Sequence, residues 1–195
     1  MSNDPRLVLA STSSYRRDLL SRLGLSFEVC GPECDEDDWK GRGLGPSALA
    51  QALARAKAES VRPRFPEAWV LGSDQVCSLG EEVLGKPGDT DRATRMLMRL
   101  QGSEHRLCTA VALIGPDGVR EHLDVTSLHM RTLDAAAAAR YVEADRPLDC
   151  AGAYKLESRG IALFSRIESD DHTAVTGLPL MAVTSMLLEA GFKLP

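Results

Sequence analysis

The chain has 195 residues, 44% of them hydrophobic, which is enough for one α/β domain with a full core or for two small lobes that share a cleft. Its 23 Lys and Arg residues against 28 Asp and Glu residues argue against a broad basic surface for DNA or RNA, so an anionic ligand must meet a local cluster of cations. The five cysteines include no C-x-x-C pair, and the apolar run Leu7–Ala10 is too short for a signal peptide or a membrane span, so we expect a cytoplasmic protein that binds neither a membrane nor a nucleic acid polymer.

The N-terminal segment predicts a strand followed by a helix. Leu7–Ala10 has the composition of a short buried strand, and Ser11–Ser14 follow it as candidates for a helix N-cap. Leucines then recur at helical spacing as far as Leu23, and Gly24 stands where a residue in the left-handed conformation ends a helix. The chain therefore opens with a strand, a polar turn and a helix.

A second helix is expected to begin at Pro46, because proline suits the first turn of a helix. Leu49, Leu53 and Ala56 recur at helical spacing as its apolar stripe, and Lys57 lies one position beyond them. On this pattern alone, Lys57 is a residue of a solvated helix face.

The middle of the chain carries a strand, two turns and a helix. Residues 69–72 form a short apolar run that we interpret as a strand, and residues 73–75 (Ser-Asp-Gln) as the polar turn that ends it. Residues 85–87 (Gly-Lys-Pro) predict another turn. Residues 91–100 then place apolar side chains at helical spacing.

The C-terminal half predicts a hairpin and two helices. Residues 107–114 and 119–125 are rich in strand-forming residues and are joined by a Gly-Pro-Asp-Gly turn, which favours an antiparallel hairpin. A helix capped by Thr132 is expected to reach Val142, and a last helix to run from Pro179 to just before Gly191. These elements predict a single α/β domain over residues 1–195, with a central mixed sheet flanked by helices.

Hydroxyl groups and two arginines gather at residues 11–17, the start of the first expected helix. Helix-start amides and the positive end of the helix dipole favour phosphate, and arginine binds phosphate oxygens with two parallel hydrogen bonds. The segment therefore has the composition of an anion site. Taken alone, it is better explained as an ordinary serine cap followed by solvated arginines.

Acidic residues occur at positions 35–38, directly after Cys34, and at Asp74. Each is ordinary by itself, because an acidic run is usually a solvated loop and aspartate is common in turns. A triphosphate, however, brings Mg²⁺, which takes one or two carboxylates and fills its remaining positions with phosphate and water. Lys57 and Lys86 are further cations able to meet a phosphate as point charges, although each could equally lie in solvent.

Seven segments of the chain together resemble the Maf family of nucleotide pyrophosphatases. They are LVLASTSSYRRDLLSRLGLSFEV, PECDE, ARAKAES, VLGSDQV, LGKP, LDCAGAY and TGLPL, in this order. The resemblance implies a Maf/ITPase-like α/β fold with two lobes around a deep cleft, a homodimer, and hydrolysis of the bond between the α- and β-phosphates of a nucleoside triphosphate.

The resemblance also implies roles for individual residues. Ser13 and Arg16 match the phosphate-binding positions of the family. Its acidic and lysine active-site positions correspond to Glu36, Lys57, Asp74 and Lys86. Asp74 and Glu36 are expected to hold Mg²⁺, or Mn²⁺ or Co²⁺ in its place, and Asp74 to orient or deprotonate the attacking water. Lys57, Lys86 and Arg16 are expected to stabilise the charge that builds on the phosphoryl oxygens.

Three positions indicate which base the protein reads. Tyr15, Gln75 and Glu157 differ from the arginine, threonine and glutamine of the branch that acts on dTTP and UTP, and the chain is more similar to the branch that hydrolyses 7-methyl-GTP. Methylation at N7 makes guanine a cation, which an aromatic face and a carboxylate attract and an arginine repels. We therefore expect Tyr15 to stack on the base and Glu157 to accept hydrogen bonds from its edge, with Gln75 assisting.

Other functions stay open at this point. A dTTP/UTP pyrophosphatase shares the fold, and a housecleaning enzyme for inosine triphosphate would give no special reason for Glu157. A nucleotide-binding regulator of cell division and septum formation would not need Asp74 and Glu36 beside several phosphate-directed cations. The pattern of residues favours the enzyme.

Overall fold

The computed structural model describes residues 5–194 and shows an α/β protein built around a mixed sheet of seven strands. The strands are β1 (Leu7–Ala10), β2 (Glu28–Val29), β3 (Trp69–Leu79), β4 (Glu82–Leu84), β5 (Glu104–Gly115), β6 (Gly118–Met130) and β7 (Phe164–Glu168). The α-helices of the described residues are α1 (Ser14–Ser21), α2 (Glu36–Lys40), α3 (Pro46–Val61), α4 (Thr90–Leu100), α5 (Ala135–Asp145) and α6 (Leu180–Glu189). Short 3₁₀ turns are η1 (Arg62–Arg64), η2 (Ala151–Ala153), η3 (Arg159–Leu163) and η4 (Ala174–Thr176). The predicted α/β class and mixed sheet are confirmed.

The sheet combines parallel and antiparallel pairs in the order β2-β1-β3-β5-β6-β7, with β4 attached to β3 outside this path. β1 runs parallel to both β2 and β3, and the remaining pairs are antiparallel. β5 and β6 form the predicted hairpin, longer at both ends than the residue pattern indicated. β3 is central, because it pairs with β5 along one edge and with β1 and β4 along the other.

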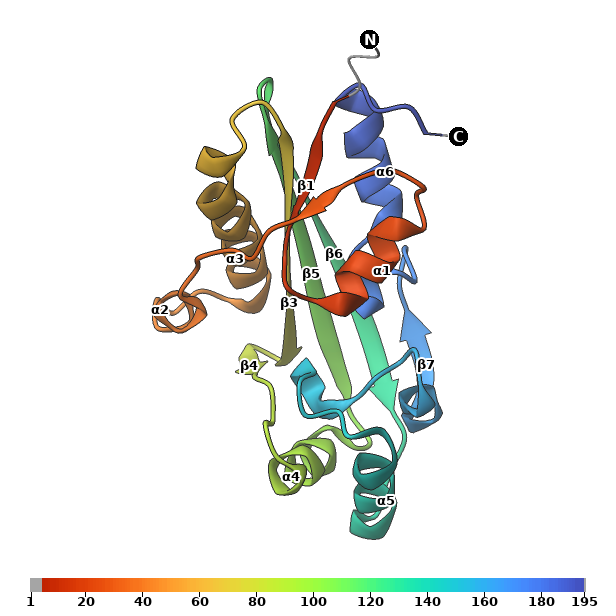
Figure 1. Ribbon diagram of the computed structural model, residues 1–195. Coiled ribbons are helices and arrows are strands. Elements are labelled where there is room, and N and C mark those ends of the chain that lie inside the picture. The colour runs from red at the N-terminus through yellow and green to blue at the C-terminus, as the bar shows by residue number, and fades with distance from the viewer. Residues whose placement is uncertain (1–4, 195) are drawn as a thin grey trace.

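Two layers of helices cover the part of the sheet that contains β1 (Figure 1). On one face, Leu53 of α3 packs with Val76 of β3 in one cluster of buried residues. On the other face, Leu20 of α1 and Leu187 of α6 pack against Leu71 of β3. Burial of these side chains stabilises the layers by about 1.5–3 kcal/mol for each large aliphatic residue.

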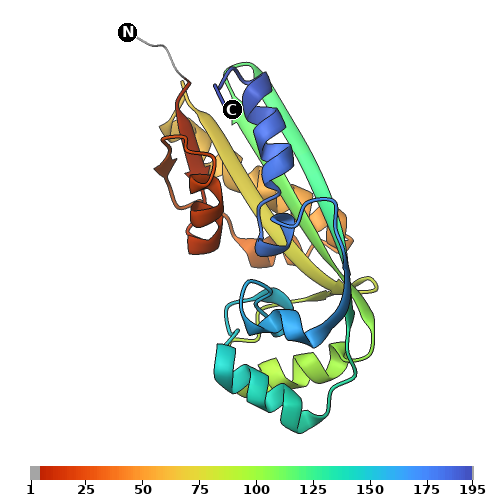
Figure 2. The same cartoon turned by 90° about the vertical axis from the view of Figure 1, so that its right-hand side faces the viewer.

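A second core lies at the far end of the long strands. There Leu97 of α4 and Val142 of α5 pack with Leu107, Leu128 and Phe164 of the sheet. Figure 2 shows α4 and α5 grouped at the end of the molecule away from the chain termini, with α1, α3 and α6 at the other end. β3 contributes to the cores at both ends, with Leu71 at one and Cys77 at the other.

One expected turn is wrong. Residues 73–75 continue β3 instead of ending it, and their backbone pairs with β5 from Ser73 opposite Val111 to Gln75 opposite Thr109. The polar side chains are tolerated because each has a partner: the Ser73 hydroxyl, for example, donates to the Gly177 carbonyl at 2.9 Å. Tertiary pairing therefore overrides a local signal for a turn.

The acidic run was also assigned wrongly as a loop. It forms α2, whose N-cap Asp35 accepts hydrogen bonds from the backbone N–H groups of Asp37 and Asp38. Acidic residues suit the first turn of a helix, because its dipole is positive there. A third expectation is also wrong: the N-cap of α5 is Asp134 rather than Thr132.

The remaining expected elements agree with the structure. β1 has the predicted bounds, Ser13 caps α1, and Gly24 adopts a φ of 69° in the left-handed region. α3 begins at Pro46, but its buried stripe includes Lys57 while Ala56 is only half-buried. Between residues 5 and 194, no helix combines the length and the apolar character needed to cross a membrane.

Candidate active site

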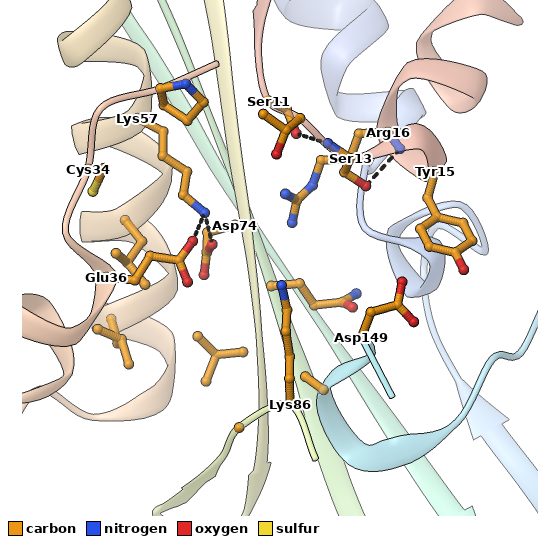
Figure 3. A pocket seen from close by; sticks show the side chains of 18 of the residues that line it. Ser11, Ser13, Tyr15, Arg16, Cys34, Glu36, Lys57, Asp74, Lys86 and Asp149 are labelled. Carbon is orange, nitrogen blue, oxygen red and sulfur yellow. Dashed lines mark hydrogen bonds and ion pairs between the residues drawn. The ribbon is translucent and has the colours of Figure 1, made fainter. Parts of the chain in front are cut away.

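The site opens at a gap beside β3. β1 pairs with this strand as far as Ala10 opposite Gly72, and β4 pairs with it from Leu84 opposite Cys77. Between these two registers, residues 73–76 have no strand neighbour on that edge in the described part of the chain. The segments that follow β1 and β4 therefore face the same short stretch of β3, and a cavity lies there (Figure 3).

The cavity has two compartments. The main cavity, of about 710 Å³, is lined by the turn after β1, by parts of α2, α3 and β3, and by the turn after β4. The side cavity, of about 140 Å³, shares Tyr15, Arg16, Gln75 and Lys86 with it and extends to Glu157. Every predicted site residue thus lines at least one of two adjoining cavities, although the residues range along the sequence from Ser13 to Glu157.

Lys57 stands between two carboxylates in the main cavity. Its Nζ lies 2.6 Å from Glu36 Oε1 and 2.6 Å from Asp74 Oδ1. The side chains of Lys57 and Asp74 are 8% and 9% exposed, whereas that of Glu36 is 40% exposed. We call these three residues the carboxylate–lysine cluster; one ammonium against two carboxylates leaves it with a net negative charge.

The close packing of α3 on β3 explains how a lysine reaches a buried aspartate. At Gly72 a Cβ atom would lie 2.2 Å from the Ala54 carbonyl oxygen and 2.8 Å from the Ala58 nitrogen, so only glycine lets the helix approach this far. Lys57 lies on this face of α3, and Asp74, two residues along the strand from Gly72, points to the same face. The interpretation of Lys57 as a solvated residue is therefore wrong.

The ion pair keeps Glu36 ionised. Partial burial raises the pKa of this carboxyl, but the hydrogen bond and the charge of Lys57 outweigh burial, and the charges of Lys86 and Lys40 add to the effect. The net result is a pKa below the usual value. Glu36 and the adjacent Asp74 thus present oxygen atoms able to coordinate a metal ion side by side.

Arg16 points into the main cavity from the start of α1 (Figure 3). Its backbone N–H donates to the capping hydroxyl of Ser13 at 3.4 Å, and its Nε donates to the Gly177 carbonyl at 2.9 Å. Burial lowers the pKa of the guanidinium, and the charges of Asp74 and Glu36 oppose this shift. One nitrogen therefore anchors the side chain while the rest of the guanidinium stays available to a phosphate.

Lys86 approaches the main cavity from the opposite side, on the turn after β4, and its ammonium points toward Asp74 (Figure 3). It is exposed, and within residues 5–194 it forms no ion pair shorter than 4.0 Å. It differs in this respect from Lys57, which two carboxylates already hold. Lys86 is thus a cation that an incoming anion can engage.

The predicted base-reading residues surround the side cavity. Tyr15 and Gln75 line both compartments, and Glu157 lines the smaller one. The amide nitrogen of Gln75 donates to Thr109 Oγ1 at 2.9 Å and to the Ala174 carbonyl at 2.9 Å, which fixes its orientation. Its amide oxygen is left to accept hydrogen bonds, as the N1 and N2 groups of guanine require.

Two charged residues of the cavity walls had no predicted role. Asp149 lines both compartments, and Lys40 lines the main cavity from the last residue of α2. Asp149 belongs to the LDCAGAY segment, so its place in that segment was the available signal. Lys40 follows Glu36 by one helical turn, a relation that was hidden because a loop was expected there.

The donor set fits a divalent cation shared with a substrate. Glu36 and Asp74 both contact the same Lys57 ammonium, so their oxygens converge on one region of the main cavity. In the described residues no group of three or more His, Cys, Asp or Glu side chains is arranged to hold a metal on its own. Two carboxylates suit Mg²⁺ when phosphate oxygens and water complete its coordination.

Comparison with known proteins agrees with this arrangement. The model of the family described as Maf-like protein matches residues 6–190. This chain belongs to the Maf family. A Maf relative from Xanthomonas campestris pv. campestris (strain 8004), named 7-methyl-GTP pyrophosphatase, is 51% identical over 192 residues, which cover 98% of this chain and 99% of the relative.

Two more distant Maf relatives carry the same name. The protein from Bdellovibrio bacteriovorus is 43% identical over 185 residues, covering 95% of this chain and 97% of the relative. The protein from Pseudomonas aeruginosa is 42% identical over 193 residues, covering 98% of this chain and all (100%) of the relative. The predicted membership of the Maf family is confirmed.

Proposed function

We propose that this Maf protein hydrolyses 7-methyl-GTP to 7-methyl-GMP and pyrophosphate. The proposal rests on one feature of the molecule: the carboxylate–lysine cluster and two phosphate-directed cations share a cavity that opens into a side cavity lined by Glu157. The names of the Xanthomonas, Bdellovibrio and Pseudomonas relatives support the same substrate. The enzyme would thereby remove a modified nucleotide.

In this proposal the triphosphate lies in the main cavity, with Ser13, Arg16 and Lys86 along its oxygens. Asp74 orients a water molecule and accepts its proton as the water oxygen attacks the α-phosphorus. A new oxygen–phosphorus bond forms while the bond from the α-phosphorus to the oxygen that bridges it to the β-phosphorus breaks. Pyrophosphate leaves with the bonding electron pair, and Lys57 stabilises the developing charge together with the other cations.

Asp74 and Glu36 would hold the divalent cation, with Mg²⁺ as the expected ion and Mn²⁺ or Co²⁺ as substitutes. When bound, such an ion polarises phosphoryl oxygens as a Lewis acid. The role of the chain is to keep two ionised carboxylates side by side, and Lys57 does so by lowering the repulsion between them.

The methylated base would occupy the side cavity. Tyr15 offers an aromatic face to the cationic ring, an attraction worth about 0.5–2 kcal/mol depending on how dry the site is. Glu157 and the amide oxygen of Gln75 would accept hydrogen bonds from the N1 and N2 groups of guanine. The volume of this compartment, about 140 Å³, suits a base better than a whole nucleotide.

We further propose that the two ends of the molecule behave as the two lobes of the Maf/ITPase-like fold, with the substrate in the cleft between them, and that the chain works as a single domain. β3 joins these ends, and its residues 73–76, which have no strand neighbour on the edge away from β5, line the cleft. The homodimer and the cytoplasmic location stay predictions.

A substrate panel tests the proposed function directly. Purified protein is offered 7-methyl-GTP, GTP, dTTP, UTP and CTP with Mg²⁺, and released pyrophosphate is measured. We expect kcat/KM to be highest for 7-methyl-GTP. A clear preference for dTTP or UTP would show that the base has been assigned wrongly, and absence of pyrophosphate release from every nucleotide would remove the enzymatic proposal.

A further inference from the structure

The charges around the two compartments are distributed unevenly. The main cavity is entered by Arg16 and Lys86, neither of which pairs with a carboxylate within 4.0 Å in residues 5–194. Both cations also line the side cavity, but of the two compartments only the side cavity reaches Glu157, so its wall carries the carboxylates of Asp149 and Glu157, with Lys155 as a nearby cation. In a ligand with an anionic tail and a cationic ring, the two cations attract the tail and the two carboxylates attract the ring. A ligand with a neutral ring gains only the attraction of its tail.

Asp149 occupies the junction of the two compartments and lines both. Its carboxylate is turned toward Tyr15, and Lys86 lies on its other side (Figure 3). Its only ion pair among the described residues is a long one, 3.7 Å from Oδ1 to Lys155 Nζ, and its side chain is 64% exposed. The pKa of Tyr15 is raised, mainly by burial, with Cys150 and Asp149 adding to the effect, which agrees with a carboxylate close to the ring.

Backbone contacts fix the segment that carries Asp149. The N–H of Gly88, two residues after Lys86, donates to the Leu148 carbonyl at 3.0 Å, which ties this segment to the phosphate-facing turn. After Asp149 the chain bends sharply, with φ values of 82° at Gly152 and 62° at Ala153. Asp149 and Glu157 are thereby brought to the walls of the same small cavity.

We propose that Asp149 is a specificity-determining residue, whose carboxylate selects the positive charge of an N7-methylated guanine held against Tyr15. This inference rests on the proposed function and adds a second acidic residue to Glu157. A carboxylate beside the ring plane lowers the free energy of a cationic base and does nothing comparable for unmodified guanine. Its effect is moderate because the side chain is partly exposed to water.

The test compares kcat/KM for 7-methyl-GTP and GTP in the wild type, Asp149→Asn and Asp149→Glu at one ionic strength. Asp149→Asn is expected to lower the ratio of the two values about threefold to fivefold, as for a partly exposed charge pair. Asp149→Glu, which restores the charge, is expected to recover most of the ratio. The matched control is Asp18→Asn, which removes an exposed carboxylate of α1 that does not line either cavity.

Product inhibition isolates the base from the departing phosphates. The inhibition constant of 7-methyl-GMP should rise in Asp149→Asn by a similar factor, while that of GMP should change less. If both substrates and both products lose the same factor, Asp149 acts on phosphate or on Lys86, and the inference is wrong. If the wild type itself shows no preference for 7-methyl-GTP, the proposed function fails and takes this inference with it; a wild-type preference that Asp149→Asn leaves unchanged overturns the inference alone.

Discussion

The two sides of the cavity are built in different ways. Asp74 and Lys57 belong to β3 and α3, are almost fully buried, and hold each other at 2.6 Å. Asp149 and Glu157 lie on irregular chain between α5 and β7 and are exposed. The buried pair at the centre of the proposed chemistry therefore stands on a strand and a helix, whereas the two carboxylates assigned to the base stand on irregular chain, residues 146–163, which we call the recognition loop. Tyr15 of α1 and Gln75 of β3 face the base from regular elements. Binding residues on a loop that a rigid scaffold positions are a common arrangement in proteins.

The two sides should also differ in how much folding stability a substitution costs. Removing Lys57 leaves both carboxylates of the cluster without their cation, and Asp74 lies where water reaches it poorly, so the loss of folding free energy is large. Removing an exposed carboxylate on the recognition loop costs little in folding. Substitutions on the two sides should thus separate into those that alter chemistry or stability strongly and those that alter substrate preference.

The largest effect is expected for Asp74→Asn, which keeps the shape of the side chain but removes its charge and its basicity. Hydrolysis should fall about 10²–10⁴-fold, because both proton acceptance and a metal ligand are lost. Pyrophosphate release measures the loss, and equilibrium binding of the nucleotide serves as the control. A nucleotide-binding regulator would retain its function in this variant, whereas hydrolysis that survives intact would remove Asp74 from the mechanism.

The second effect concerns the pH dependence of stability and arises from a buried histidine that contacts the recognition loop. His105 is buried, and its Nε2 lies 3.0 Å from the hydroxyl of Tyr154, a residue of the side-cavity wall. Burial lowers the pKa of His105 to about 4 from 6.5, with a small contribution from His129. The unfolded chain therefore binds a proton that the folded protein does not bind between these values, and stability falls as the pH falls from about 6.5 to 4.

The difference of about 2.5 pH units between 6.5 and 4, at about 1.4 kcal/mol per unit, sets an upper limit of about 3.5 kcal/mol. At pH 4, where the folded protein itself holds half a proton at this site, the expected loss is about 3 kcal/mol. Urea unfolding of the wild type and of His105→Gln at pH 7 and pH 4 measures it. The pH-dependent loss should be smaller in the variant, while the matched control His122→Gln, on an exposed position, should lose as much as the wild type. Equal losses in all three proteins would contradict the assignment.

Lys86→Gln sharpens the comparison on the phosphate side. This lysine is exposed and unpaired in residues 5–194, so the free energy of unfolding should barely change. kcat/KM should fall about tenfold to a hundredfold for every triphosphate alike, because a cation directed at phosphate does not distinguish bases. Steady-state kinetics with 7-methyl-GTP and GTP measure the fall, and a change confined to one base would contradict a role at the phosphates.

Of the four changes compared in this section, Glu157→Gln should have the smallest effect and the most selective one. Loss of the charge is expected to lower the preference for 7-methyl-GTP over GTP about threefold to tenfold, with phosphate chemistry largely intact. The measurement is the ratio of kcat/KM for the two nucleotides, with Glu143→Gln on the exposed face of α5 as the matched control. Equal loss of activity on all nucleotides would instead place Glu157 among the catalytic groups.

Local pattern was sufficient for some elements and insufficient for others. β1, α1 and α6 could be predicted because an apolar run or a helical repeat, bounded by a cap or a glycine, is complete within a few residues. β3 was cut short in the prediction because Ser73–Gln75 has the composition of a turn, and only pairing with β5 makes it a strand. The same limit hid α2, whose acidic residues suit a loop and the first turn of a helix equally well.

The sequence by itself determined the kinds of chemical groups and the family, because motifs such as VLGSDQV and LGKP can be recognised without knowledge of the fold around them. Only the tertiary structure decided where those groups meet. β1 ends opposite Gly72 and β4 ends opposite Cys77, and the space left beside β3 becomes the cavity. Strand registers and the approach of α3 depend on contacts between distant segments, so no local pattern contains the geometry of Lys57 between two carboxylates.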